Sequence, residues 1–227
     1  MGKARQRSVK FTKMKTDNNT FKTEQESFWA GQFGDEYIPR NEATPESLSG
    51  NLFFFARIFE KFRPLPQSVI EFGSNIGINL KAIRLLSPNS HIAAVEINSL
   101  AVQRLRQEKI ANEVFHDSIL EFEALQKFEF SLIKGVMIHL SPEHLAAVYK
   151  TLAQSSSRHV LIAEYYNRRP EEVLYRGHSG KLFRRDFGGE FMDANPEFSL
   201  LDYGFSYHRD SRELQDDLTW FLFERKA

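Results

Sequence analysis

The stretch that decides the fold is "SVIEFGSNIGINLKAIRLL", which spans residues 68–86. It begins with a short β-type run, continues through a tight turn bounded by Gly73 and Gly77, and ends in a segment whose apolar residues recur with the period of a helix. A strand, a tight turn and a helix in this order form the element that commonly holds nucleotide-type ligands. The stretch therefore predicts such a site at the end of a parallel strand.

Outward from this stretch, the predicted elements alternate between strands and helices. Strands are predicted at residues 68–72, 91–97, 113–115, 130–134 and 159–164, and helices at residues 78–86, 100–109 and 142–153. Such alternation indicates a parallel sheet with helices on both faces. Two further strand-like runs near the carboxyl end, joined by at most eight residues, predict an antiparallel hairpin at the sheet edge. The expected fold is α/β, a doubly wound and mostly parallel seven-stranded sheet of the class I methyltransferase type.

The length of 227 residues suits one sizeable α/β core. We expect a single domain at residues 21–227, preceded at residues 1–20 by a disordered basic leader with six Lys and Arg residues. Within the domain, residues 21–66 are expected to form an N-terminal helical lid and residues 67–227 a Rossmann-like core. Ser141 is expected to cap the helix that follows it.

Composition excludes several classes of function. Lys+Arg and Asp+Glu both total 30, so the formal net charge is zero and the charge excess typical of nucleic-acid-binding proteins is absent. The chain has no Cys, which removes disulfides, thiol nucleophiles and the usual zinc sites. His139 and His144 do not share a helix face, so no metal site is expected. No apolar run approaches the roughly 20 residues of a membrane span, and we expect a cytoplasmic protein.

The glycine turn does not fit a dinucleotide or a nucleoside triphosphate. Asn75 stands where a dinucleotide fingerprint needs its middle glycine, and no third glycine follows. Asn tolerates a positive φ, so the turn itself can form, but the backbone cannot approach a pyrophosphate as closely. What remains is the spacing of Glu71, Gly73 and Gly77. A carboxylate at Glu71 repels phosphate and suits a cationic ligand with an amino group.

S-adenosylmethionine (SAM) is such a ligand, because it carries a sulfonium and an α-ammonium group. Glu96 ends the next strand, 19 residues after Gly77, and can accept the ribose hydroxyls. Asp117 ends the third strand and can accept the adenine amino group, with Ser118 or Ile119 beside the ring. Three acids at successive strand ends therefore predict a SAM site. The predicted cofactor-binding residues are Glu71, Gly73, Ser74, Asn75, Gly77, Glu96, Ile97, Asp117, Ser118, Ile119, Lys134 and Gly135.

The chain also resembles a known family. The resemblance is carried by "TEQESFWAGQFGDEYIPRN", "VIEFGSNIGINLKAI", "LIKGVMIHLSPEHL", "IAEYYNRRP", "KLFRRDFGGE" and "DYGFSYHRD…DDLTWFLFERK", and it spans about residues 21–226. These segments resemble the pseudaminic acid biosynthesis-associated methylases, which are SAM-dependent methyltransferases linked to bacterial nonulosonic-acid pathways. The resemblance implies a class I fold, SAM as cofactor and a sugar-type acceptor. The basic leader departs from the family pattern, so it is given no role.

Two residues are candidate proton acceptors for methyl transfer to a hydroxyl. His139 follows the fourth strand and has an ordinary pKa of about 6.5, which suits a general base. A structural histidine packed under Ser141 is the alternative. Glu164, at the end of the fifth strand, is the second candidate base.

Three groups of residues are candidates for acceptor binding. The first lies in the lid and consists of Trp29, Tyr37 and Arg40, unless the lid is only a packing brace. The second follows the fifth strand and consists of Tyr165, Tyr166 and Asn167, whose polar tips suit a sugar. The third is a basic cluster of Lys181, Arg184 and Arg185, which predicts an anionic acceptor unless it is a solvated loop face.

The preferred function is O-methylation of a nonulosonic acid, similar to pseudaminic acid, or of its nucleotide-activated form. A methyltransferase acting on another small molecule, and a non-catalytic binding partner with the same fold, are alternatives. Methylation of RNA or protein is disfavoured by the neutral charge. An NAD-dependent sugar oxidoreductase is disfavoured by Asn75 and the missing third glycine.

Overall fold

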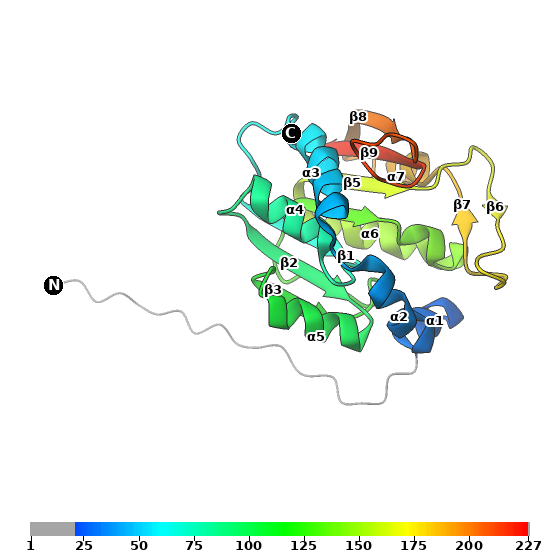
Figure 1. The fold of residues 1–227 in the computed structure, drawn as a ribbon. Helices are drawn as coiled ribbons and strands as arrows, with labels where there is room; N and C mark the ends of the chain where they lie inside the picture. Colours follow the sequence, from blue (N-terminus) through cyan, green and yellow to red (C-terminus); the bar gives the residue numbers. More distant parts are fainter. Residues whose placement is uncertain (1–20, 227) are drawn as a thin grey trace.

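The predicted sheet is present in the computed structural model, which describes residues 21–226 (Figure 1). Its strands are β1 (Ser68–Phe72), β2 (His91–Glu96), β3 (Glu113–His116), β4 (Phe128–Lys134), β5 (Ser156–Glu164), β8 (Phe198–Ser206) and β9 (Leu218–Arg225). They are arranged in the order β3-β2-β1-β4-β5-β9-β8. Strands β1 to β5 are parallel, and β9 runs antiparallel to both β5 and β8. The predicted fold class is confirmed, whereas the predicted leader lies outside the described residues.

Helices cover both faces of this sheet. The α-helices are α1 (Glu24–Ala30), α2 (Gln32–Tyr37), α3 (Pro45–Phe59), α4 (Ile78–Leu86), α5 (Ser99–Glu108), α6 (Leu145–Ser155) and α7 (Phe187–Ala194). Short 3-10 turns are η1 (Ile38–Asn41), η2 (Met137–His139) and η3 (Pro142–His144). Among residues 21–226, no helix has the length and apolar character needed to cross a membrane.

The core has two halves, one on each face of the sheet. On one face, side chains of α3, α4 and α5 pack against the strands, with Phe54, Phe55 and Ile58 of α3 almost fully buried. On the other face, α6 and α7 pack against the same strands. Burial of each large apolar side chain contributes about 1.5–3 kcal/mol. Helix α3 therefore belongs to the core layer, although residues 21–66 were predicted to be a lid.

Two local predictions were wrong. The connection between β8 and β9 spans residues 207–217, so it is longer than the eight residues expected. Ser141 makes no side-chain capping hydrogen bond, because the chain first forms the 3-10 turn η3 and α6 begins only at Leu145.

Three elements between β5 and β8 were not predicted. Strands β6 (Glu171–Glu172) and β7 (Phe183–Arg184) form a small antiparallel sheet of their own. Helix α7 begins after Asp186, whose side chain accepts a hydrogen bond from the Gly189 N–H at 2.8 Å. These elements were missed because the segment lacks a clear apolar period and two of them are only two residues long.

Helices α1 and α2 lie at the same end of the molecule as the small β6–β7 sheet (Figure 1). The contacts that join these segments include an ion pair and a hydrogen bond. The Lys181 ammonium lies 2.7 Å from Glu24 Oε1, and Gln25 Nε2 donates to the Gly180 carbonyl at 2.9 Å. Segments that are about 155 residues apart in the chain therefore meet at one end of the sheet.

Candidate active site

A cavity of about 470 Å³ opens at the carboxyl ends of the central parallel strands. Because the strand order reverses between β1 and β4, this is the switch point at which open α/β sheets bind ligands. Its lining includes these predicted cofactor residues: Gly73, Ser74, Asn75, Glu96, Ile97, Asp117, Ser118, Ile119, Lys134 and Gly135. Their roles toward a cofactor stay predictions, but the fold brings them together as the parallel arrangement requires.

The glycine turn has the backbone conformation that its sequence predicts. Gly73, Asn75 and Gly77 have φ values of 71°, 46° and 81°, so Asn75 does adopt a positive φ. Gly77 does not line the cavity. A Cβ atom at Gly77 would lie 2.7 Å from Leu105 Cδ2, so this glycine allows the turn to pack closely against α5. Gly77 therefore supports the packing of the turn and does not contact a ligand in the cavity.

Two buried oxygens next to the turn have no hydrogen-bond partner among residues 21–226. The Glu71 carboxyl is 1% exposed and lies behind the cavity, where its Oε1 accepts from Asn79 Nδ2 at 2.7 Å. Glu71 Oε2 and Asn79 Oδ1 are both unpaired, and Asn79 lines the cavity. Burial raises the pKa of Glu71 to about 8. Since unpaired buried acceptors are costly, this arrangement suits a ligand that brings N–H donors.

Glu96 braces the turn and still lines the cavity. Its Oε2 accepts from the Asn75 N–H at 2.7 Å, and its Oε1 accepts from the Asn98 N–H at 2.8 Å. Burial raises the pKa of this carboxyl. Each carboxylate oxygen can accept a second hydrogen bond, so capacity remains for ribose hydroxyls.

Helix α1 contacts the predicted adenine end of the cavity. Ser118 Oγ donates to Glu26 Oε1, and Glu26 is a buried residue of α1 that also lines the cavity. Asp117 lines the cavity as well, and its Oδ1 accepts from the Ser118 N–H at 2.9 Å. On the neighbouring loop, Asn98 Nδ2 donates to the carboxylate of Asp35 in α2 at 2.8 Å. The lid is therefore tied to the ends of β2 and β3.

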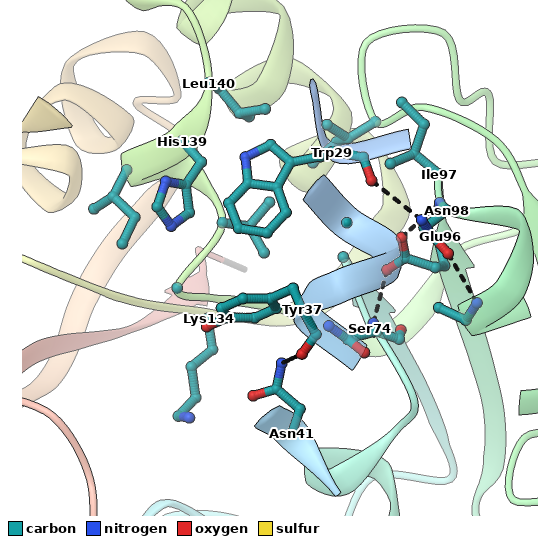
Figure 2. Close-up of a pocket in the computed structure, with 18 of the residues that line it drawn as sticks. Trp29, Tyr37, Asn41, Ser74, Glu96, Ile97, Asn98, Lys134, His139 and Leu140 are labelled. Carbon is teal, nitrogen blue, oxygen red and sulfur yellow. Dashed lines mark hydrogen bonds between the residues drawn. The ribbon is translucent and has the colours of Figure 1, made fainter. Parts of the chain in front are cut away.

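His139 lies inside the cavity against an aromatic ring of α1 and another of the β6–β7 turn. Its ring centroid is 4.6 Å from that of Trp29 and 4.7 Å from that of Tyr175, and Figure 2 shows the indole beside the imidazole. Its Nδ1 lies 2.6 Å from the Lys181 carbonyl oxygen. Because a carbonyl only accepts, Nδ1 carries the proton and Nε2 keeps a free lone pair. Burial lowers the pKa of His139 to about 4, so the ring is neutral at pH 7.

Glu164 does not reach the cavity. It is 2% exposed, and its carboxylate accepts from the backbone N–H groups of Val136, Met137 and Ile138 at 3.0, 2.9 and 3.4 Å. The prediction that Glu164 is a second base is therefore corrected. This carboxylate stabilises the turn after β4, because it satisfies three N–H groups that have no strand partner.

The predicted basic cluster is not assembled at the cavity, and none of its three members lines it. Lys181 is buried and pairs with Glu24 of the lid. Arg184 is exposed beside Glu171, and Arg185 binds Glu190 Oε1 through Nε and Nη2 at 2.9 and 2.8 Å. Each cation has an acid partner of its own, which the sequence alone did not reveal.

Three other predicted acceptor residues also lie outside the cavity. Tyr166 is 44% exposed, as strand alternation requires once Tyr165 lines the cavity. Asn167 donates to Glu171 Oε2 at 3.0 Å. Arg40 is exposed, with its guanidinium 6.0 Å from the Tyr37 ring centroid.

The predicted lid residues Trp29 and Tyr37 do line the cavity, next to residues that sequence reasoning missed. Tyr165 donates from its hydroxyl to Asp216 Oδ2 at 2.9 Å, and Asp216 belongs to the long β8–β9 connection. Burial, together with Tyr175, raises the pKa of Tyr37 to about 12. The missed lining residues include Gln25, Glu26, Asn79, Asn98, Tyr175, Arg176, Gln215 and Asp216.

Lys134 is a half-buried cation of this cavity, and Figure 2 shows it below Tyr37. Its ammonium lies 5.8 Å from the Phe54 ring centroid. Burial lowers the pKa of Lys134, whereas the nearby carboxyl groups of Glu71 and Asp216 oppose this shift. The cavity therefore combines acids along the predicted cofactor side with hydroxyls, rings and a cation beside them.

Solved structures with a similar fold are methyltransferases. Magnesium protoporphyrin IX methyltransferase from Synechocystis PCC 6803, with bound SAM, has a TM-score of 0.64 at 12% identity, covering 92% of this chain and 100% of that one. A Burkholderia thailandensis 1,6-didemethyltoxoflavin-N1-methyltransferase, bound to its substrate and S-adenosylhomocysteine (SAH), has a TM-score of 0.61 at 15% identity, covering 86% of each chain. The plantazolicin methyltransferase BpumL with SAH has a TM-score of 0.60 at 13% identity, covering 89% of this chain and 94% of that one.

No protein-family model matches the sequence, and no curated protein matches it significantly. At such low identities, structural similarity shows the fold alone. The chain therefore has the class I methyltransferase fold, and its activity is argued from its own residues.

Proposed function

We propose that this chain is a SAM-dependent methyltransferase that methylates a small molecule. More narrowly, we propose that the acceptor is a hydroxyl oxygen of a nonulosonic acid, similar to pseudaminic acid, or of its nucleotide-activated form. The broader statement is supported by the fold and by the cavity at the switch point. The narrower one is supported by the sequence resemblance and by the hydroxyl-rich lining that includes Tyr37, Tyr165 and Tyr175.

The observation that carries the cofactor proposal is the pair of unpaired oxygens on Glu71 and Asn79. An α-ammonium group brings three donors, so it can bind Asn79 Oδ1 and favour the ionised form of the carboxyl behind it. A pyrophosphate brings no donor for Asn79 Oδ1, and its negative charge opposes ionisation of Glu71. Along the same edge, Glu96 retains acceptor capacity for ribose, and Asp117 lies where the adenine amino group is expected.

When bound, SAM supplies an electrophilic methyl group on a sulfonium. The acceptor oxygen forms the new C–O bond as the S–CH₃ bond breaks, and the hydroxyl proton must leave. His139 Nε2 is the group of this chain that can take that proton, because Nδ1 is held by the Lys181 carbonyl. Trp29 and the rest of the lid exclude water from the reacting atoms. The hydroxyls of Tyr165 and Tyr175 orient a polar acceptor.

The first experiment is a calorimetric titration of the purified chain with SAH and, separately, with NAD. We expect SAH to bind and NAD not to bind. A folded protein that binds no SAH would refute the cofactor proposal. The protein is then incubated with SAM and a panel of sugar acids, their nucleotide derivatives and neutral sugars, and each mixture is analysed by mass spectrometry for the gain of one methylene. Binding of SAH without methylation of any panel member would favour the non-catalytic alternative over a sugar methyltransferase.

A further inference from the structure

A tight turn between β6 and β7 places an arginine at the cavity. Residues 175–178 close on themselves, because the Tyr175 N–H donates to the His178 carbonyl at 2.9 Å and the His178 N–H donates to the Tyr175 carbonyl at 2.8 Å. The two central residues, Arg176 and Gly177, have φ values of 49° and 87°. Reciprocal hydrogen bonds around two residues of positive φ are the features of a type I′ hairpin turn.

Arg176 is an unfavourable residue for this position. The first central residue of a type I′ turn is usually Asn, Asp or Gly, because a longer side chain is strained at positive φ. Strain of this kind is concentrated at functional sites, where the surrounding structure maintains it. The turn would form more easily with Asn, so the arginine is explained by its side chain and not by the backbone.

The place of the side chain indicates what it does. Arg176 lines the cavity and is exposed, so it lies at the opening. Among the described residues Arg176 has no carboxylate partner. Arg184 and Arg185, which belong to the same insertion between β5 and α7 (residues 165–186), face Glu171 and Glu190. The neighbour of Arg176 is the Tyr175 ring, whose centroid is 5.6 Å from the guanidinium carbon.

Tyr175 connects this guanidinium to the interior of the site. Its ring centroid is 4.7 Å from that of His139 and 6.3 Å from that of Trp29. The Tyr175 ring is therefore a shared neighbour of Arg176 and of His139. The residues proposed to bind SAM belong to other elements, because Glu96 ends β2 and Asp117 directly follows β3.

We propose that Arg176 binds an anionic group of the methyl acceptor, a carboxylate or a phosphate, at the opening of the cavity. A guanidinium fork pairs with either group through two parallel hydrogen bonds. This inference rests on the proposed function, and it replaces the basic cluster that the sequence suggested with a single residue. It also makes acceptor choice depend on the β6–β7 turn.

The test uses the full chain saturated with SAH, titrated by calorimetry with three probes. N-acetylneuraminic acid carries a carboxylate, its methyl ester lacks that charge, and its CMP derivative adds a phosphate. Arg176→Asn removes the guanidinium and keeps a residue that favours the turn, so its melting temperature should not fall. Arg184→Asn is the matched control, because it removes an exposed guanidinium of the same segment that lies outside the cavity.

We expect the wild type and Arg184→Asn to bind at least one of the acidic probes at least tenfold more tightly than the methyl ester. Arg176→Asn should lose this preference, with its SAH affinity unchanged. Binding of the carboxylate probe alone, or of the CMP derivative alone, identifies which anion the arginine holds. If the preference persists in Arg176→Asn, or if no acidic probe binds to the SAH complex, the inference is wrong. A chain that fails to bind SAH at the start refutes the proposed function instead.

Discussion

Replacing Glu71 by Gln tests the cofactor site at its most unusual group. In the folded protein, burial raises the pKa of Glu71 to about 8, from 4.5 for an exposed carboxyl. At about 1.4 kcal/mol per pKa unit, keeping this group ionised costs the folded state about 5 kcal/mol. The folded state holds the proton more tightly than the unfolded state, so protonation of Glu71 stabilises the fold. This stabilisation is complete below pH 4.5, decreases as the pH rises to 8, and is lost above pH 8. Glu71→Gln removes that dependence.

The variant should therefore gain stability relative to the wild type as the pH rises from 4.5 to 8. The measurement is the free energy of unfolding in urea at several pH values, compared between the two proteins without ligand. Glutamine keeps the size of the side chain, so Asn79 retains a neighbour and the turn is expected to fold. A stability difference that does not change between pH 5 and pH 8 would contradict the buried, neutral carboxyl.

Although Glu71→Gln should stabilise the protein without ligand, it should weaken the binding of SAH. If the α-ammonium of SAH favours the ionised form of Glu71, wild-type binding releases up to one proton at pH 7, and Glu71→Gln releases none. Calorimetry in two buffers with different ionisation enthalpies counts these protons, and at pH 9 the release should vanish in the wild type as well. Loss of a hydrogen-bonded charge should weaken SAH binding by about 1.5–3 kcal/mol, or about 10–150-fold. Equal affinity and equal proton release in the two proteins would refute the ammonium assignment.

Glu164→Ala leaves three backbone N–H groups without an acceptor, so its free energy of unfolding in urea should fall by at least about 2 kcal/mol; wild-type stability would contradict its role in the turn. With a pKa of about 4, His139 is unprotonated from pH 5 to 8. The rate should therefore decline only toward pH 4, and a rate profile with a histidine step near pH 6.5 would argue against this buried base. Gly77→Ala combines a φ of 81° with a 2.7 Å approach to Leu105 Cδ2, so thermal unfolding should show a loss of about 1–3 kcal/mol, and an unchanged melting temperature would show that the turn can relax.

The cofactor half of the site could be predicted because periodic elements place it. Once strands alternate with helices, the carboxyl ends of the parallel strands must meet at one edge. That requirement brings Ser74, Glu96, Asp117 and Lys134 to one cavity without any knowledge of side-chain contacts. The sequence also indicated that Asn75 tolerates a positive φ, and the turn confirms it.

The direction of a side chain beyond its strand was harder to predict. Glu164 and Tyr165 are adjacent, and strand alternation separates them to opposite sides. Which of the two side chains faces the cavity depends on the tertiary structure, in which Tyr165 lines the cavity. The carboxylate of Glu164 instead meets three N–H groups of the turn after β4, a partnership between segments 28 residues apart that no local pattern encodes.

The acceptor half depends on contacts between segments that lack a strong period. Lys181 looked like a free cation in the sequence, but its partner Glu24 lies in the first helix. Arg176 was missed because its importance comes from a two-residue turn. An Arg-Gly pair between short strands was the available signal, and only the positive φ of Arg176 distinguishes it from an ordinary loop.

Lys181 connects the insertion both to His139 and to helix α1. The Lys181 carbonyl fixes the tautomer of His139, while its ammonium holds Glu24 and lies 5.1 Å from the Phe28 ring centroid. Lys181 therefore fixes the tautomer of the proposed proton acceptor and also anchors helix α1. Arg176, on the same insertion, faces the opening, while the cofactor residues are held by the parallel strands and their turns. We therefore expect substitutions at Arg176 to alter acceptor choice without removing the groups proposed to bind SAM, because those groups lie on the parallel strands and the turns that follow them.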